Sequence, residues 1–144
     1  MNSIAKTIVR PAVIDAPELF PSLAALTGRL LIAPIFLMSG VGKITGAATY
    51  LGYIQAFGLP FPELALVSAI VIELLGGLML VAGYRVRAAA SVLAVFSLAT
   101  ALVFHSNFGD QNEFLHFWKN AAMAGGLFQI AALGAGRFGL DKSA

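Results

Sequence analysis

The chain has 144 residues, of which 59% are hydrophobic and 11% charged, and its mean hydropathy is +0.88. A soluble domain of this length cannot cover so much apolar surface, so we expect a single domain embedded in a membrane. The absence of cysteine excludes disulfides, thiol redox catalysis and cysteine-ligated iron–sulfur or zinc centres. The net charge of +2 comes from scattered Lys and Arg residues, without the basic stripe that indicates nucleic-acid binding.

Residues 1–21 contain three prolines, which interrupt a continuous helix, and are predicted to form a cytoplasmic tail. We expect no cleaved secretory signal, because the first apolar run is too long and lacks a small-residue cleavage site. That run predicts the first membrane span, residues 22–42. It contains Arg29 and Pro34 and is followed by Lys43. A proline inside a membrane helix is tolerated and predicts a bend.

The segment between residues 44 and 62 is too long for a tight turn and too polar for a membrane span. Tyr50, Tyr53 and Phe57 recur in it at helical spacing. Aromatic residues concentrate at the membrane–water boundary, so this pattern predicts a short interfacial helix.

Residues 64–83 form the second predicted span, and Glu73 lies close to its middle. A carboxylate at this depth costs about 2.5 to 3.5 kcal/mol to insert, so we expect it to face protein or water and to have a partner. Ala65, Ala69 and Gly77 fall on the same side of the helix as Glu73. This stripe of small residues predicts the face on which the span packs.

Residues 88–104 and 117–136 are the third and fourth predicted spans. The third is uncharged and ends at His105, and the fourth begins beside Lys119 and Asn120. Only complete helices satisfy their backbone in lipid, so the predicted fold is a four-helix antiparallel transmembrane bundle, all-α, over residues 22–140.

The distribution of cations predicts the orientation of this bundle. Two sit on one side, Lys43 and Lys119, and six sit on the other: Lys6, Arg10, Arg85, Arg87, Arg137 and Lys142. The positive-inside rule then places both termini in the cytoplasm.

Two groups of polar residues are candidate sites. Arg29 and Glu73 fall at similar predicted depths, with Gln129 near the same level, and we expect a buried Arg29–Glu73 pair with Gln129 as a further partner. Such a pair either only fixes the register of the helices or has a catalytic or proton-relay role.

The second group lies at the outer ends of three spans: Lys43, His105, Lys119 and Asn120. Lysines there are also explained by snorkelling to the headgroups, whereas histidine and asparagine are not. We expect a ligand site at this level. A haem site is not expected, because His105 ends a helix and His116 lies in a predicted loop, and no metal site is predicted.

Several short motifs follow one another along residues 26–141: Gly28-Arg29-Leu30-Leu31, Ser39-Gly40-x-x-Lys43, Gly58-Leu59-Pro60, Glu73-Leu74-x-Gly76-Gly77, Phe117-x-Lys119-Asn120 and Gly125-Gly126-Leu127. In these motifs the chain resembles the DoxX family. The family is named for a subunit associated with thiosulfate:quinone oxidoreductase, and its members are often described as components of membrane oxidoreductases. The resemblance implies a bacterial inner-membrane protein and carries over no agreed catalytic residues.

Two function classes follow from these observations. In the first, the chain is a quinone-interacting component of a membrane oxidoreductase, without a redox centre of its own; the outer cluster holds the quinone and a partner subunit supplies the electrons. In the second, it is a non-enzymatic membrane module that binds a partner protein or a lipid.

Overall fold

The computed structural model describes residues 16–141, with side chains from residue 19 onward. Its elements are α1 (Ala16–Thr45), α2 (Ala47–Ala56), α3 (Pro62–Ala82), α4 (Val86–Phe104) and α5 (Gln111–Leu133). Within this described part there is no β-strand. The all-α fold is therefore confirmed, including the short helix predicted between the first two long ones.

Three of the helices are long and apolar enough to cross a bilayer, over Leu19–Thr45, Pro62–Ala82 and Val86–Phe104. They correspond to the first three predicted spans. The predicted fourth span, residues 117–136, falls on α5, whose first turns are polar because they carry Glu113, Lys119 and Asn120. That α5 also crosses the membrane stays a prediction.

The predicted boundary of the N-terminal tail is corrected by the start of α1. Residues 16–21 are helical, although Pro17 and Pro21 lie among them. Pro17 lies in the first turn, where a proline costs no intrahelical hydrogen bond because the N–H groups there have no partner within the helix. Pro21 lies inside the helix, one turn further on. The rest of the predicted tail, residues 1–15, lies outside the described residues.

At three positions a leucine side chain of one long helix packs directly against a glycine of another. A Cβ atom added to Gly40 would lie 2.7 Å from Leu74, and one added to Gly76 would lie 2.8 Å from Leu93. Gly77 approaches Leu37 in the same way. These contacts bring α1, α3 and α4 together and follow the small-residue face predicted around Glu73.

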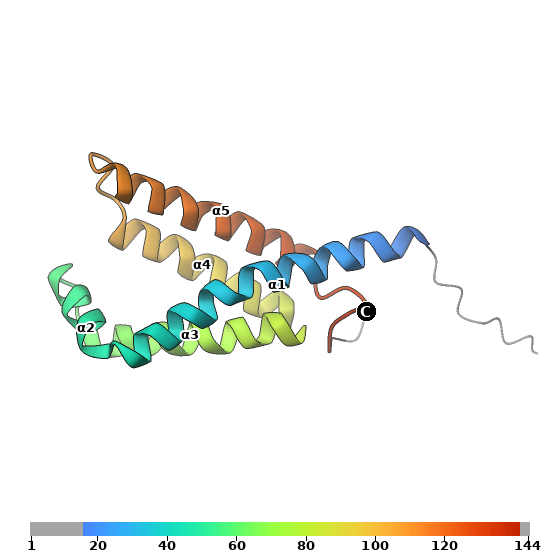
Figure 1. Cartoon of the computed structure of the whole chain (residues 1–144), viewed down its shortest axis with the longest axis horizontal. Coiled ribbons are helices and arrows are strands. Elements are labelled where there is room, and N and C mark those ends of the chain that lie inside the picture. Colours follow the sequence, from blue (N-terminus) through green and yellow to red (C-terminus); the bar gives the residue numbers. More distant parts are fainter. Residues whose placement is uncertain (1–15, 142–144) are drawn as a thin grey trace, which may run out of the picture.

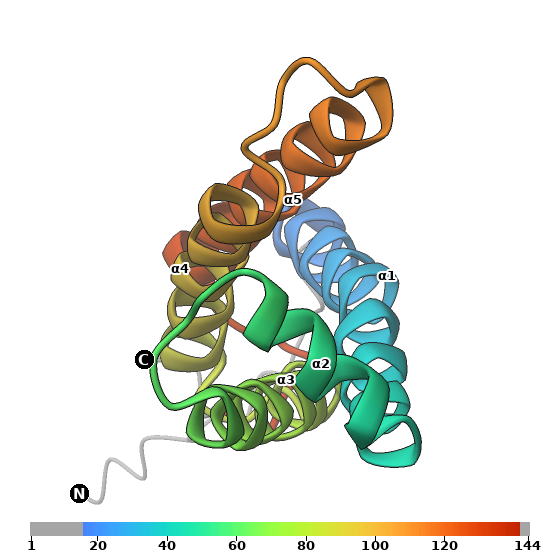
Figure 2. The same cartoon turned by 90° about the vertical axis from the view of Figure 1, so that its left-hand side faces the viewer.

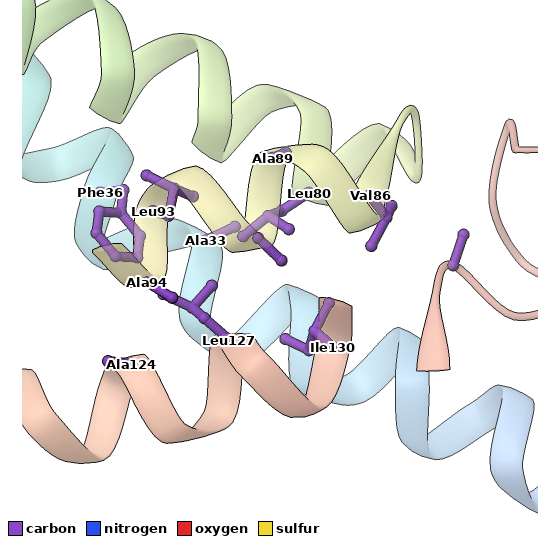
Figure 3. Packing of buried hydrophobic residues seen from close by; sticks show 12 residues of the cluster. Ala33, Phe36, Leu80, Val86, Ala89, Leu93, Ala94, Ala124, Leu127 and Ile130 are labelled. Carbon is purple, nitrogen blue, oxygen red and sulfur yellow. The ribbon is translucent and has the colours of Figure 1, made fainter. Parts of the chain in front are cut away.

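The apolar core lies between the four long helices. Leu80 of α3, Leu93 of α4 and Leu127 of α5 are fully buried and meet Ala33 and Phe36 of α1 (Figure 3). Most other large apolar side chains of the long helices are exposed, as lipid-facing surfaces require.

The helices are arranged as two pairs, α1 with α3 and α4 with α5. The pairs separate toward the end where α2 and the α4–α5 loop lie, which we call the α2 end (Figure 1). Seen from that end, α2 lies across α3 beside the end of α1 (Figure 2).

The opposite end of the bundle is held together by Arg29. Its guanidinium donates from Nη1 to the carbonyl of Leu80, at 2.7 Å, and from Nη2 to the carbonyls of Ala135 and Phe138, at 3.2 and 2.9 Å. One fully buried side chain of α1 therefore ties the end of α3 to the segment that follows α5. The last four carbonyls of a helix have no intrahelical partner, so they are available as acceptors.

Candidate functional site

Glu73 is bound by two side chains of α1. The Nζ atom of Lys43 lies 2.8 and 2.9 Å from its two carboxylate oxygens, and the Ser39 hydroxyl donates to Oε1 at 3.1 Å. Lys43 also donates to Ser39 Oγ at 2.7 Å. Because Ser39 and Lys43 are four residues apart on one helix, both face the carboxylate. The three form a closed network that we call the Lys43–Glu73 cluster.

The predicted Arg29–Glu73 pair is therefore wrong. Glu73 is opposite Gly40 in the antiparallel α1–α3 pair, with only 3.5 Å between its Cβ atom and the position of a Cβ on Gly40. Arg29 lies three turns away along α1, where it meets the carbonyl end of α3 instead. Gln129, the predicted further partner, is exposed on α5.

A cavity of about 370 Å³ lies at the α2 end, inside the space where the helix pairs separate. Its polar lining comes from the Lys43–Glu73 cluster, from Tyr50 and Tyr53 of α2, and from Thr100 and His105. The remaining walls are apolar and come from α2, α3, α4 and the loop before α3: Ile54, Leu59, Ala65, Ala69, Phe96, Ala99, Val103 and Phe104. The cavity thus combines charged and hydrogen-bonding groups with a largely apolar wall.

The side of the cavity between α2 and α4 is closed by aromatic rings. The backbones of α2 and α4 do not pack against each other. Tyr53 stacks on Phe104 with ring centroids 5.5 Å apart, and Phe57 meets Phe104 edge-on at 5.1 Å. Partial burial, and to a smaller extent the Glu113 carboxylate, raise the pKa of Tyr53. Its hydroxyl therefore remains a hydrogen-bond donor at neutral pH.

His105 is held in place by α5. Its Nδ1 atom lies 2.6 Å from Oε2 of Glu113, and its ring stacks on His116 at a centroid distance of 5.1 Å. The contact to Glu113 occupies Nδ1 and leaves Nε2 as the free ring nitrogen. His105 thus reaches the cavity wall with a fixed ring orientation.

The predicted outer cluster is only partly assembled. Lys43 and His105 line the same cavity, whereas Lys119 and Asn120 are not among its lining residues. Lys119 is exposed, and the Asn120 amide donates to the carbonyl of His116 at 3.0 Å. The reason is that the backbone of α5 packs against α4 and α1 rather than against α2 or α3.

Sequence reasoning missed five polar residues of the site: Ser39, Tyr50, Tyr53, Thr100 and Glu113. Ser39 and the two tyrosines carried a usable signal. Ser39 is one helical turn before Lys43, and Tyr50 is among the aromatics of the predicted interfacial helix; its ring lies 5.3 Å from Lys43 Nζ. Thr100 and Glu113 gave no such signal, because their roles depend on contacts between helices.

Metal ligands do not gather in this part of the molecule. Among residues 16–141 there is no group of three or more His, Cys, Asp or Glu side chains placed to hold a metal ion. The site instead combines a charge pair, hydroxyl groups and an imidazole around an apolar space, which are groups that can bind a ligand.

Comparisons with known proteins agree with the membrane architecture. The family model described as DoxX matches residues 24–106. Over 117 residues the chain is 39% identical to inner membrane protein YqjF of Escherichia coli K12, an alignment covering 81% of this chain and 88% of that protein. It is 30% identical over 122 residues to inner membrane protein YphA of the same organism, covering 81% and 87%. No solved structure matches the chain significantly.

Proposed function

The chain belongs to the DoxX family and is an integral protein of the bacterial inner membrane, and from this premise we propose that it binds the headgroup of a membrane quinone in the cavity at the α2 end. In this proposal it serves as a component of a membrane oxidoreductase system, and a partner subunit exchanges the electrons. The observation that carries the proposal is the pairing, within one cavity, of the Lys43–Glu73 cluster with apolar walls.

The chemistry of a quinone headgroup suits such a lining. A quinone is a flat ring with two carbonyl acceptors and little other polarity. The hydroxyls of Tyr50 and Tyr53 are donors, and His105 contributes its imidazole. The Lys43–Glu73 cluster, whose N–H and O–H groups bond to one another, supplies a polar wall beside them. A volume of about 370 Å³ lies at the lower end of the range of small-molecule sites, which suits one ring.

The aromatic cluster of Tyr53, Phe57 and Phe104 supports a route of entry. Side chains alone close the space between α2 and α4, and aromatic rings move faster than helices do. A membrane-dissolved ligand can therefore reach the cavity without a change in the bundle.

The test compares His105→Ala with Asn120→Ala for quinone binding. His105 lines the cavity, whereas Asn120 is nearby in the fold but outside the lining, so the second variant is the matched control. Loss of one hydrogen-bonding partner is expected to weaken binding about tenfold in His105→Ala and to leave Asn120→Ala at the wild-type value. Binding of a short-chain ubiquinone is measured by calorimetry in nanodiscs, together with quinone retained after mild extraction and with folded yield.

Two results would overturn the proposal. In the first, the wild-type protein retains no quinone after extraction and binds no added quinone. In the second, the wild type and His105→Ala bind quinone with equal affinity. Either would leave the second function class, a non-enzymatic module that binds a partner protein or a lipid.

A further inference from the structure

A second hollow of about 190 Å³ lies between α3 and α4, nearer the end held by Arg29. Its lining is apolar throughout: Val71, Ile72, Leu75, Gly76 and Met79 of α3, and Ala88, Ala89 and Val92 of α4. Val71, Leu75 and Val92 are more than half exposed, so this groove opens on the outer surface of the bundle. We call it the α3–α4 groove.

The groove follows the cavity along the same two helices. On α3, Ala69 of the cavity is three residues from Ile72 of the groove, and on α4, Phe96 of the cavity is four residues from Val92. These spacings place each pair on adjacent turns of one helix face. Cavity and groove are thus consecutive hollows of one seam.

Polarity changes sharply along this seam. The cavity contains Lys43, Glu73 and His105, whereas no side chain of the groove carries a polar atom other than the thioether of Met79. Two of the lining residues, Gly76 and Ala89, have little or no side chain. A polar hollow followed by an apolar one matches an amphiphile with a compact head and a long chain.

We infer that the α3–α4 groove binds the isoprenoid tail of the quinone whose headgroup occupies the cavity. This inference rests on the proposed function and extends it, because it assigns a second subsite to the ligand. Lipid is as apolar as the groove, so the tail gains packing contacts there rather than a hydrophobic driving force. The expected gain in affinity from the tail is therefore modest, about three- to tenfold.

The experiment measures the affinity ratio between a long-tailed and a short-tailed quinone in nanodiscs, by competition against one headgroup probe, at equal mole fractions in the membrane. Val92→Trp and Leu75→Trp fill the groove from its two sides. Each has a matched control on the same helix that is similarly exposed but outside the lining: Val95→Trp for α4 and Leu78→Trp for α3.

If the tail occupies the groove, the wild type and both controls bind the long-tailed quinone about three to ten times more tightly than the short-tailed one. In both groove variants this affinity ratio falls to about one, and the affinity for the short-tailed quinone is the same in all five proteins. A ratio that stays the same in the groove variants, or falls equally in the controls, would overturn the tail subsite while leaving the headgroup site intact. If the short-tailed quinone fails to bind the wild type, the proposed function itself fails.

Discussion

At the scale of single residues, the two buried charged side chains of the described chain, Arg29 and Glu73, are stabilised in different ways. Glu73 has a cationic partner, Lys43, with Ser39 completing its hydrogen bonds. Arg29 has backbone carbonyls as its acceptors, and a helix C-terminus carries a partial negative charge that favours a cation. The first arrangement forms a wall of the cavity, and the second closes the opposite end of the bundle.

A double-mutant cycle distinguishes these two arrangements. Glu73→Gln and Lys43→Met are each expected to destabilise the fold by about 3 kcal/mol, because each leaves the other partner without its counter-charge. The double variant is expected to lose much less than the sum of the two. Unfolding is followed by circular dichroism in mixed detergent micelles.

Arg29→Met combined with Glu73→Gln is the control cycle. Arg29 and Glu73 share no partner, so their effects are expected to add to within about 0.5 kcal/mol. Strong coupling between Arg29 and Glu73, or additivity between Lys43 and Glu73, would contradict the observed pairing.

At the scale of elements, α4 obtains its N-terminal cap from a distant part of the chain. Arg85, which precedes α4, has a left-handed backbone with φ of 44° and makes no side-chain cap. The Asp141 carboxylate accepts hydrogen bonds instead from the backbone N–H groups of Arg85 and Val86, at 2.6 and 2.9 Å. The segment after α5 is therefore attached both to α4 through Asp141 and to α1 through Arg29.

Asp141→Ala is expected to lower the stability of the fold by about 1 kcal/mol, as loss of an N-terminal cap does. Asp141→Asn keeps an acceptor oxygen and is expected to lose less. Thermal unfolding of the purified protein in detergent measures both. Equal stability of wild type and Asp141→Ala would show that the cap contributes nothing.

At the scale of the whole molecule, the arrangement of the helices places the cavity at one end and the Arg29 contacts at the other (Figure 1). The exposed arginines of the described chain, Arg85, Arg87 and Arg137, lie at the Arg29 end. With the positive-inside rule, this predicts that the cavity faces the outer half of the membrane and that both termini are cytoplasmic.

Reporter fusions test this orientation. An alkaline phosphatase fused after Asn107, in the α4–α5 loop, is expected to be active because that loop lies in the periplasm. The same enzyme fused after Lys142 is expected to be inactive, and a fluorescent protein that matures only in the cytoplasm is expected to report there. Activity of the phosphatase at the C-terminus alone would reverse the topology.

Composition and periodicity were sufficient to predict the class of the fold. Long apolar runs specify membrane helices because an unpaired backbone is costly in lipid, and the stripe of Ala69 and Gly77 around Glu73 marked a packing face. The motif order was sufficient to identify the family. Helix formation, the packing face and the motifs depend on local sequence, so they can be predicted for each helix without knowing how it packs on the others.

The tertiary structure decided which charged residues pair and which residues line the cavity. At 1.5 Å per residue, the depth of a side chain depends on where its helix begins and how two antiparallel helices are offset, and this offset brought Lys43 rather than Arg29 to Glu73. Likewise, the packing of α5 on α4 and away from α2 left Lys119 and Asn120 outside the cavity and brought Glu113 to His105. Such contacts are determined by the angle and offset of packed helices, which hydrophobic periodicity along one helix does not contain.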